Sequence, residues 1–266
     1  MARSTFYYHL KRLGNTSKYK EEKKRIKEIF QESKGRYGYR RITLQLRNDG
    51  YVINHKTVEK LMQDLGIKCL IRKKRYRSYK GTVGKIAPNI LNRDFKTDCP
   101  YSKLATDVSQ ISIGQQKSFL SPIIDMFNGE ILSYNVSDRA DLEQINKMLK
   151  DVFAITDKAP AGNKILLHSD QGWQYQHAYF RNRLKEHGII QSMSRKGNCY
   201  DNCIMEPFFG RIKTELYYGF EKDYTSFEEF AIAIDEYIDY YNNKRIQANT
   251  KWMPPVKYRE ASMMSA

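Results

Sequence analysis

Residues 164–175, KILLHSDQGWQY, contain a short apolar run that ends in a polar cluster with one carboxylate, Asp170. The run Ile165–Leu167 is typical of a strand buried inside a sheet. In an open α/β sheet, ligands bind just beyond the carboxyl ends of such strands. Asp170 is therefore a candidate catalytic or ligand-binding residue, although a carboxylate at a strand end is more often solvated or ion-paired.

Two other carboxylates stand in comparable settings. Asp107 lies in LATDVSQISI, residues 104–113, an alternating run that predicts a strand. Glu206 lies in GNCYDNCIMEPFFGRIKTEL, residues 197–216, where it introduces a segment of helical period. Two carboxylates on strands and one on a helix can converge on a pair of divalent ions, and oxygen ligands of this kind suit Mg²⁺ or Mn²⁺. These carboxylates are therefore candidate metal ligands.

The residue after Glu206 restricts where its helix can begin. Pro207 disfavours helical backbone at the preceding residue and has no N–H to donate. We expect the helix to begin between Cys203 and Glu206, because the donors of a first turn are unpaired in any case. An earlier start would kink the helix and turn Glu206 away from the metals. Lys213, seven residues further on, would share a helix face with Glu206.

The net charge of +16 is concentrated in the N-terminal third. Residues 1–96 contain 26 Lys and Arg against 8 Asp and Glu, whereas residues 97–266 contain 20 against 22. The stretch IRKKRYRSYK, residues 71–80, alone contains six basic residues and two tyrosines. This asymmetry predicts a nucleic-acid-binding part attached to a near-neutral catalytic body. A basic surface without a partner is the less favoured alternative.

The N-terminal third has the pattern of three helices. Residues 19–34 form a charged amphipathic segment, Gly35 ends it, and a short helix follows over Arg40–Arg47. Asn54 is the expected N-cap of a third helix, whose apolar residues between Val58 and Leu65 fall on one face. Two short helices joined by a turn are typical of a helix-turn-helix, with the last helix in the major groove. Many small three-helix units do not bind DNA, but the adjoining basic run favours a DNA-binding role for this one.

The rest of the chain has a mixed α/β pattern. Residues 81–98 lack periodicity and predict a linker. The expected elements are strands over 104–113, 118–125 and 130–136, a helix over 141–154, a strand over 164–168, a helix over 176–187, a strand over 189–193, the helix with Glu206, and a last helix after the capping box Ser226–Glu229. The loop of residues 194–202 is expected to be mobile and to close over a ligand.

Composition excludes several classes of protein. No apolar run is long enough to span a bilayer, and the first residues lack the apolar region of a secretory signal. The four cysteines are too few and too scattered for a disulfide framework. We therefore expect a protein of the cytoplasm without a membrane partner.

The chain resembles the catalytic open reading frame (OrfB) of bacterial insertion-sequence transposases of the IS-three family, within the DDE transposase and retroviral integrase group. The matching stretches include ATDVSQ, SPIIDMFNGEILSY, LLHSDQGWQY, SMSRKGNCYDNCIME, FFGRIKTEL, YNNKRIQANTKWMPPVKYRE and GRYGYRRITLQL, in the family's order. The 35 residues between Asp170 and Glu206, followed by Lys213, are the signature of the group. Leu104 and Gln110 depart from the residues common among relatives.

The resemblance implies a fold and a catalytic triad. The fold is α/β, a ribonuclease-H-like catalytic core with an N-terminal all-α helix-turn-helix domain. The regions are expected at residues 1–75 (helix-turn-helix-like, DNA-binding), 76–98 (basic linker), 99–222 (integrase-type core) and 223–266 (C-terminal helix and basic tail). Asp107, Asp170 and Glu206 become the catalytic residues and the ligands of two Mg²⁺ or Mn²⁺ ions, with Asp107 bridging both.

The resemblance also implies DNA contacts. They are expected at His55, Lys56, Lys60, Arg72, Lys73, Lys74, Arg75, Arg77, Arg195, Lys196, Arg211 and Lys213.

The implied activity is metal-dependent DNA strand cleavage and strand transfer, through a circular form of the element. The implied partners are double-stranded DNA (terminal inverted repeats and target), a second copy of the chain in a homo-oligomer, and an upstream-frame DNA-binding protein, since this chain begins at Met1 without that frame. The expected location is the bacterial nucleoid in the cytoplasm. The alternative is a non-catalytic DNA-binding regulator from the same type of locus.

Overall fold

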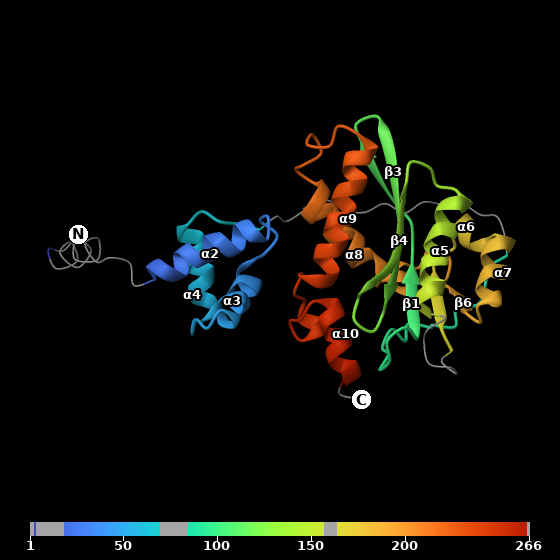
Figure 1. Ribbon diagram of the computed structural model, residues 1–266, viewed down its shortest axis with the longest axis horizontal. Coiled ribbons are helices and arrows are strands. Elements are labelled where there is room, and N and C mark those ends of the chain that lie inside the picture. The colour runs from blue at the N-terminus through green and yellow to red at the C-terminus, as the bar shows by residue number, and fades with distance from the viewer. Residues whose placement is uncertain (1–2, 4–18, 70–84, 157–163, 265–266) are drawn as a thin grey trace. The chain divides into compact units, whose positions relative to one another are not determined.

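The computed structural model describes residues 3, 19–69, 85–156 and 164–264. The chain divides into two compact units, Met1–Ile71 and Arg72–Ala266 (Figure 1). The first unit is helical and the second is built around a β-sheet. Each unit is described by itself below.

The first unit contains α2 (Lys20–Glu32), α3 (Tyr39–Asn48) and α4 (His55–Asp64). The apolar faces of the three helices form a small core of residues that include Ile26, Ile42 and Val58, all fully buried. Gly35 has a positive φ of 74° and its amide donates to the carbonyl of Phe30, which closes the end of α2. The Asn54 side chain accepts from the amide of Lys56, so the predicted N-cap is confirmed.

Among the described residues of the second unit, the sheet has six strands in the order β2-β3-β1-β5-β6, with β4 paired to β3. Their bounds are β1 (Lys103–Thr106), β2 (Ser109–Ile113), β3 (Gln116–Asp125), β4 (Ile131–Ser137), β5 (Leu166–Ser169) and β6 (Ile190–Met193). The pairs of β3 with β1, β2 and β4 are antiparallel, whereas β1, β5 and β6 run parallel. The predicted antiparallel set followed by alternating helices and strands is therefore confirmed.

The predicted strand over 104–113 is interrupted at Asp107. Thr106 pairs with Ile123 and Ser109 pairs with Leu120, so β1 and β2 keep one continuous register against β3. In that register Pro122 lies opposite Asp107. Proline has no N–H to donate to the ladder, which explains a break at this place in a central strand. Because of this break, the backbone of Asp107 belongs to neither β1 nor β2.

Helices cover both faces of the sheet (Figure 1). They are α5 (Leu142–Thr156), α6 (Trp173–Gln176), α7 (Ala178–Glu186), α8 (Met205–Ile212), α9 (Phe227–Asn243) and α10 (Pro255–Met264). One core lies between the sheet and α5 and α7, and a second core lies between the sheet and α8 and α9. The predicted helix over 176–187 is split, because His177 has extended backbone and begins α7 as its N-cap. No described helix is long and apolar enough to cross a membrane.

Two segments without regular periodicity are fixed by side-chain contacts. The part of the predicted linker that the structure describes, residues 85–98, is hydrogen-bonded to β6 through Ser192. Within residues 194–202, Cys199–Asn202 form a short 3-10 helix, here called η1. These contacts are important for the site described next.

Candidate active site

Asp107 and Asp170 lie at matching positions on neighbouring parallel strands. Ala105 of β1 pairs with His168 of β5, and each aspartate stands two residues beyond its member of that pair. The carboxyl ends of parallel strands meet at one edge of the sheet, which is where α/β proteins bind ligands. The structure therefore brings together two carboxylates that are 63 residues apart in the sequence.

Glu206 approaches the site from α8 (Met205–Ile212), whose N-cap is Ile204. Glu206 is exposed in the first turn, and Pro207 follows it within that turn. The expected start of the helix is confirmed, so Pro207 replaces an N–H that would have lacked a helical partner. The positive end of the helix dipole also favours a negative charge at Glu206.

Asp107 is influenced by the charges of the other two carboxylates. Its pKa is raised to about 8, first by burial and then by the negative charges of Asp170 and, to a smaller extent, Glu206. Hydrogen bonds from the Val108 amide and the Asn202 side chain act in the opposite direction. Burial also raises the pKa of Asp170. The negative charges of these carboxylates disfavour one another's ionisation, and a cation placed between them would relieve that repulsion.

Two residues that sequence reasoning missed hold the aspartates in place. Asn202 Nδ2 donates to Asp107 Oδ2 at 3.0 Å. The Gly172 amide donates to Asp170 Oδ1 at 2.8 Å, and a Cβ at Gly172 would lie 2.9 Å from that oxygen. Their signals in the sequence were weak: Asn202 stands four residues before Glu206, and Gly172 two after Asp170.

A buried tyrosine lies beneath the two aspartates. The Tyr175 side chain is fully buried and its hydroxyl lies 3.4 Å from Thr106 Oγ1. Burial raises the pKa of Tyr175 well above its usual value, and the charges of Asp107 and Asp170 add to the increase. Tyr175 therefore stays neutral and packs as a support of the site rather than as a nucleophile.

The three carboxylates fit a hard divalent cation. Within the part of the chain that the structure describes, Asp107, Asp170 and Glu206 have no ion pair with a basic side chain, whereas other partly buried carboxylates such as Asp201 and Glu215 are paired. No described group of three or more His, Cys, Asp or Glu residues could enclose an ion by itself. Mg²⁺ keeps several waters and takes phosphate oxygens, so one or two carboxylates per ion are sufficient.

The predicted DNA-contacting residues differ in how the structure presents them. Residues 72–75 and 77 lie outside the described residues. His55, Lys56 and Lys60 are exposed on α4, and Arg195 and Lys196 are exposed after β6. Arg211 and Lys213 are half-buried, and Lys213 begins a π-helical turn, η2 (Lys213–Tyr217). All these residues remain candidates for phosphate contacts.

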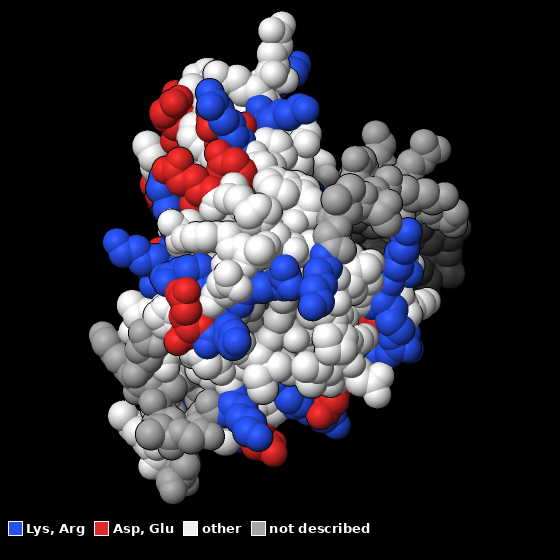
Figure 2. All heavy atoms as spheres, turned by 90° about the vertical axis from the view of Figure 1, so that its right-hand side faces the viewer, with Lys and Arg blue, Asp and Glu red and all other residues white. Residues whose placement is uncertain are grey.

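Charge is unevenly spread on the face of the second unit shown in Figure 2. Basic side chains extend across the middle of this face, and most of the visible acidic side chains gather in one corner. On this face, the basic middle part is where a polyanion would be attracted.

Three family models match successive parts of the chain. An HTH-like domain matches residues 18–75, and two integrase core domain models match residues 97–199 and 206–263. The chain is 49% identical to the putative transposase InsK for insertion sequence element IS150 of Escherichia coli, over 98% of this chain and 91% of that protein. The chain belongs to the insertion-sequence transposase family. The resemblance to the IS-three branch of the DDE group, and the enzyme class, are thereby confirmed.

A second curated relative agrees with this assignment. An uncharacterized transposase-like protein of Haemophilus influenzae is 48% identical over 84% of this chain and 100% of its own length. Among solved structures, the HTLV-2 integrase catalytic core domain in complex with magnesium aligns with 60% of this chain and 97% of its own, with 18% identity and a TM-score of 0.47. The predicted fold class, a helix-turn-helix-like region before an integrase-type α/β core, is confirmed by the matching family models.

Proposed function

We propose that Asp107, Asp170 and Glu206 are the catalytic, metal-binding residues with which this transposase cleaves DNA strands and joins them to new sites. The observation that supports the proposal most strongly is the matched position of the two aspartates beyond β1 and β5. The charge of Glu206, which contributes to the raised pKa of Asp107, supports including it as the third carboxylate.

The resemblance to the DDE group suggests how the three carboxylates would share two Mg²⁺ or Mn²⁺ ions. Asp107, whose pKa is raised by the charges of both other carboxylates, would be shared by the two ions. Asp170 and Glu206 would hold one ion each. Ions held there supply activation of the attacking oxygen and stabilisation of charge on the phosphate. Asn202 and the Gly172 amide keep the two aspartates oriented.

The chemistry consists of two displacements at phosphorus. In the first, a water oxygen bonds to phosphorus, the bond from phosphorus to the 3′ oxygen breaks, and a proton passes to solvent. A 3′-hydroxyl and a 5′-phosphate remain. In the second, that hydroxyl oxygen bonds to the phosphorus of another strand and displaces its 3′ oxygen. Neither step needs a covalent bond to a serine, cysteine or tyrosine of the chain.

The proposed substrates are the terminal inverted repeats of the element and target DNA. His55, Lys56 and Lys60 on α4 are proposed to contact the repeats, with Arg195, Lys196, Arg211 and Lys213 beside the scissile phosphate. Because two ends must be held together, we propose at least a dimer on DNA, assisted by an upstream-frame DNA-binding protein. The proposed location is the bacterial nucleoid in the cytoplasm.

A strand-transfer assay tests the proposal. The chain is incubated with Mg²⁺ and a labelled duplex that carries the terminal repeats, and nicked and joined strands are separated by size. The expected result is Mg²⁺-dependent formation of both products, lost in Asp107→Asn. DNA binding without chemistry in the wild type would instead indicate the non-catalytic regulator.

A further inference from the structure

Two adjacent residues of η1 (Cys199–Asn202) make contacts on opposite sides. Asn202, 8% exposed, donates to the carboxylate of Asp107 in the candidate active site. Asp201, 1% exposed, turns the other way and accepts hydrogen bonds from residues 89–93 and from Arg195. A single turn of chain therefore links the site to the segment that enters the catalytic unit.

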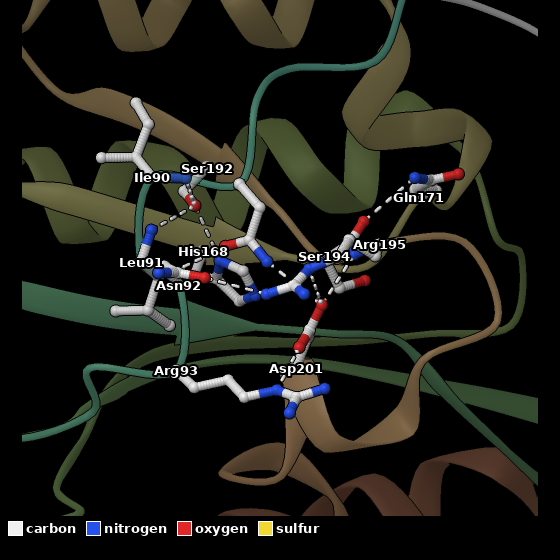
Figure 3. A network of polar contacts seen from close by, with 11 residues as sticks. Ile90, Leu91, Asn92, Arg93, His168, Gln171, Ser192, Ser194, Arg195 and Asp201 are labelled. Carbon is white, nitrogen blue, oxygen red and sulfur yellow. Dashed lines mark hydrogen bonds and ion pairs between the residues drawn. The ribbon is translucent and has the colours of Figure 1, made fainter.

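Asp201 is saturated with donors (Figure 3). Arg93 Nε donates to Oδ1 at 2.8 Å, and Asn89 Nδ2 donates to Oδ2 at 3.1 Å. The Arg195 amide also donates to Oδ2, at 3.0 Å, with its Nε 3.1 Å away. A buried carboxylate with several charged and neutral donors is strongly held, because removal of any donor leaves a buried polar atom unsatisfied.

The segment of residues 87–94, here called the strap, is fastened to β6 as well. The amides of Ile90 and Leu91 donate to the fully buried Ser192 Oγ at 3.0 and 3.1 Å, and the Met193 amide donates to the Pro88 carbonyl at 3.3 Å. Ser192 Oγ also lies 2.9 Å from His168 Nδ1 on β5, the strand that leads to Asp170 (Figure 3). The strap is thus connected to β5 indirectly, through Ser192.

Arg93 has two possible tasks. Its side chain is 46% exposed and its guanidinium lies 5.8 Å from the centre of the Tyr200 ring, so it could contact a DNA phosphate directly. However, the Nε atom of Arg93 already forms an ion pair with the buried carboxylate of Asp201. Arg195, whose side chain is 51% exposed, also forms an ion pair with Asp201 through its Nε. Two arginines directed at one buried anion indicate that holding the loop is their first task.

We propose that the strap positions the active-site loop, and that Asp201 is the positioning residue through which Arg93 and Asn89 fix Asn202 and hence Asp107. This inference rests on the proposed function for its catalytic consequence. The strap directly follows the connection from the helix-turn-helix unit, so the entry of the chain into the catalytic unit is part of the support of the active site. The strap then serves as more than a spacer.

The test compares Arg93→Ala with Arg183→Ala in the full chain. Arg183 is a matched control, since it is a partly exposed arginine that is ion-paired to Glu186 on α7. For each variant we would measure kcat and KM for strand cleavage, the Tm, and hydrogen exchange of the amides in 194–202. Because small misplacements of catalytic groups are costly, we expect Arg93→Ala to lower kcat by about tenfold with KM for DNA changed less than about twofold. Exchange of the Arg195 amide should become faster, and Arg183→Ala should leave kcat, KM and this exchange unchanged.

Each result decides the proposal. A higher KM with unchanged kcat and unchanged exchange would make Arg93 a phosphate contact and overturn it. Faster exchange with unchanged kcat would overturn the positioning role, and a fall in Tm alone would leave Arg93 a merely structural residue. If the wild type shows no chemistry, the proposed function fails. In that case hydrogen exchange of the amides in 194–202 still tests whether the strap holds the loop. Faster exchange in Arg93→Ala supports that role, and unchanged exchange overturns it.

Discussion

Asp107 and Asp170 share one edge of the sheet because Ala105 and His168, two residues before them, are register partners of parallel strands. Backbone pairing thus fixes where the chain leaves the sheet just before each aspartate. Groups carried at strand ends of a packed sheet are better positioned for reaction than groups on loops.

Amide substitutions of the triad should abolish chemistry. Asp107→Asn, Asp170→Asn and Glu206→Gln keep the shape of each side chain but remove the charge that holds a hard cation. We expect cleavage and joining to be lost while folding and DNA binding persist, measured by gel assay, circular dichroism and fluorescence anisotropy. Asp125→Asn and Asp201→Asn should retain measurable activity. An active triad variant beside an inactive Asp125 variant would reverse the assignment.

Gly172 should be intolerant of a side chain. Its φ of −57° suits any residue, so backbone strain is no obstacle. The obstacle is space, since a Cβ would lie 2.9 Å from Asp170 Oδ1 and 2.6 Å from the side-chain nitrogen Nε2 of Gln174. Gly172→Ala should therefore displace the aspartate and lower kcat by about tenfold or more, with a small change in Tm. Gly188→Ala is a poor control because its φ is positive, whereas Gly210→Ala meets open space. Equal activity of Gly172→Ala and Gly210→Ala would contradict the close approach.

The sequence predicted elements whose signals are local. The N-cap at Asn54, the start of α8 before Pro207 and the capping box at Ser226 depend on the residues within one turn, and the structure contains each. Phe230, Ile234 and Tyr241 of α9 recur at helical spacing and are buried. Such patterns follow from side-chain periodicity alone.

Features that depend on distant residues were not predicted. The strand over 104–113 carried no sign of a break, because the cause, Pro122, lies on the neighbouring strand. Residues 81–98 lacked periodicity and predicted a linker, but Ser192 and Asp201 satisfy the backbone and side chains of the strap from about 100 residues away. Asn202 could not be assigned to Asp107 for the same reason, since the two are 95 residues apart.

DNA affinity should depend on the N-terminal charge. Replacing Arg72, Lys73 and Lys74 by glutamine should weaken binding and make the slope of log affinity against log salt less negative, by about 0.9 for each phosphate that is no longer neutralised. The matched control replaces Lys117, Lys150 and Lys185, three exposed lysines of the catalytic unit. Anisotropy titrations at several salt concentrations measure both. Equal weakening in the two triple variants would show that net charge alone matters.

Asp125 should make stability fall as the pH rises. This carboxylate is fully buried, and burial raises its pKa from 3.8 to about 6, against hydrogen bonds from the Phe127 and Tyr101 amides. A carboxyl whose pKa is higher in the folded state stabilises the fold below pH 3.8 and loses that contribution as the pH passes 6. The side chain of Asp125→Asn cannot titrate, and one of its two oxygen acceptors is replaced by a nitrogen donor. The loss of that acceptor should lower the free energy of unfolding by about 1–3 kcal/mol.

The measurement is the Tm of both proteins between pH 4 and pH 7. The Tm advantage of the wild type over Asp125→Asn should shrink across this range. The same comparison with Asp138→Asn, whose carboxylate is 64% exposed, should give a constant difference. An advantage that grows with pH would show that the two backbone amides outweigh burial.

Pro207 separates an active transposase from a disabled one. The structure begins α8 at Met205, so the proline falls in the first turn, where its missing N–H has no helical partner to lose. Pro207→Asn should then change the rate of Mg²⁺-dependent joining by less than about tenfold, or roughly 1.4 kcal/mol of barrier. The Tm should also change little, because no hydrogen bond of the helix is gained. If the proline instead kinked the helix, Asn would restore the direction of Glu206 and raise the rate by orders of magnitude. Pro207→Ala serves as the second variant, since it restores the N–H without a polar side chain, and the two variants should behave alike if backbone geometry is the only difference.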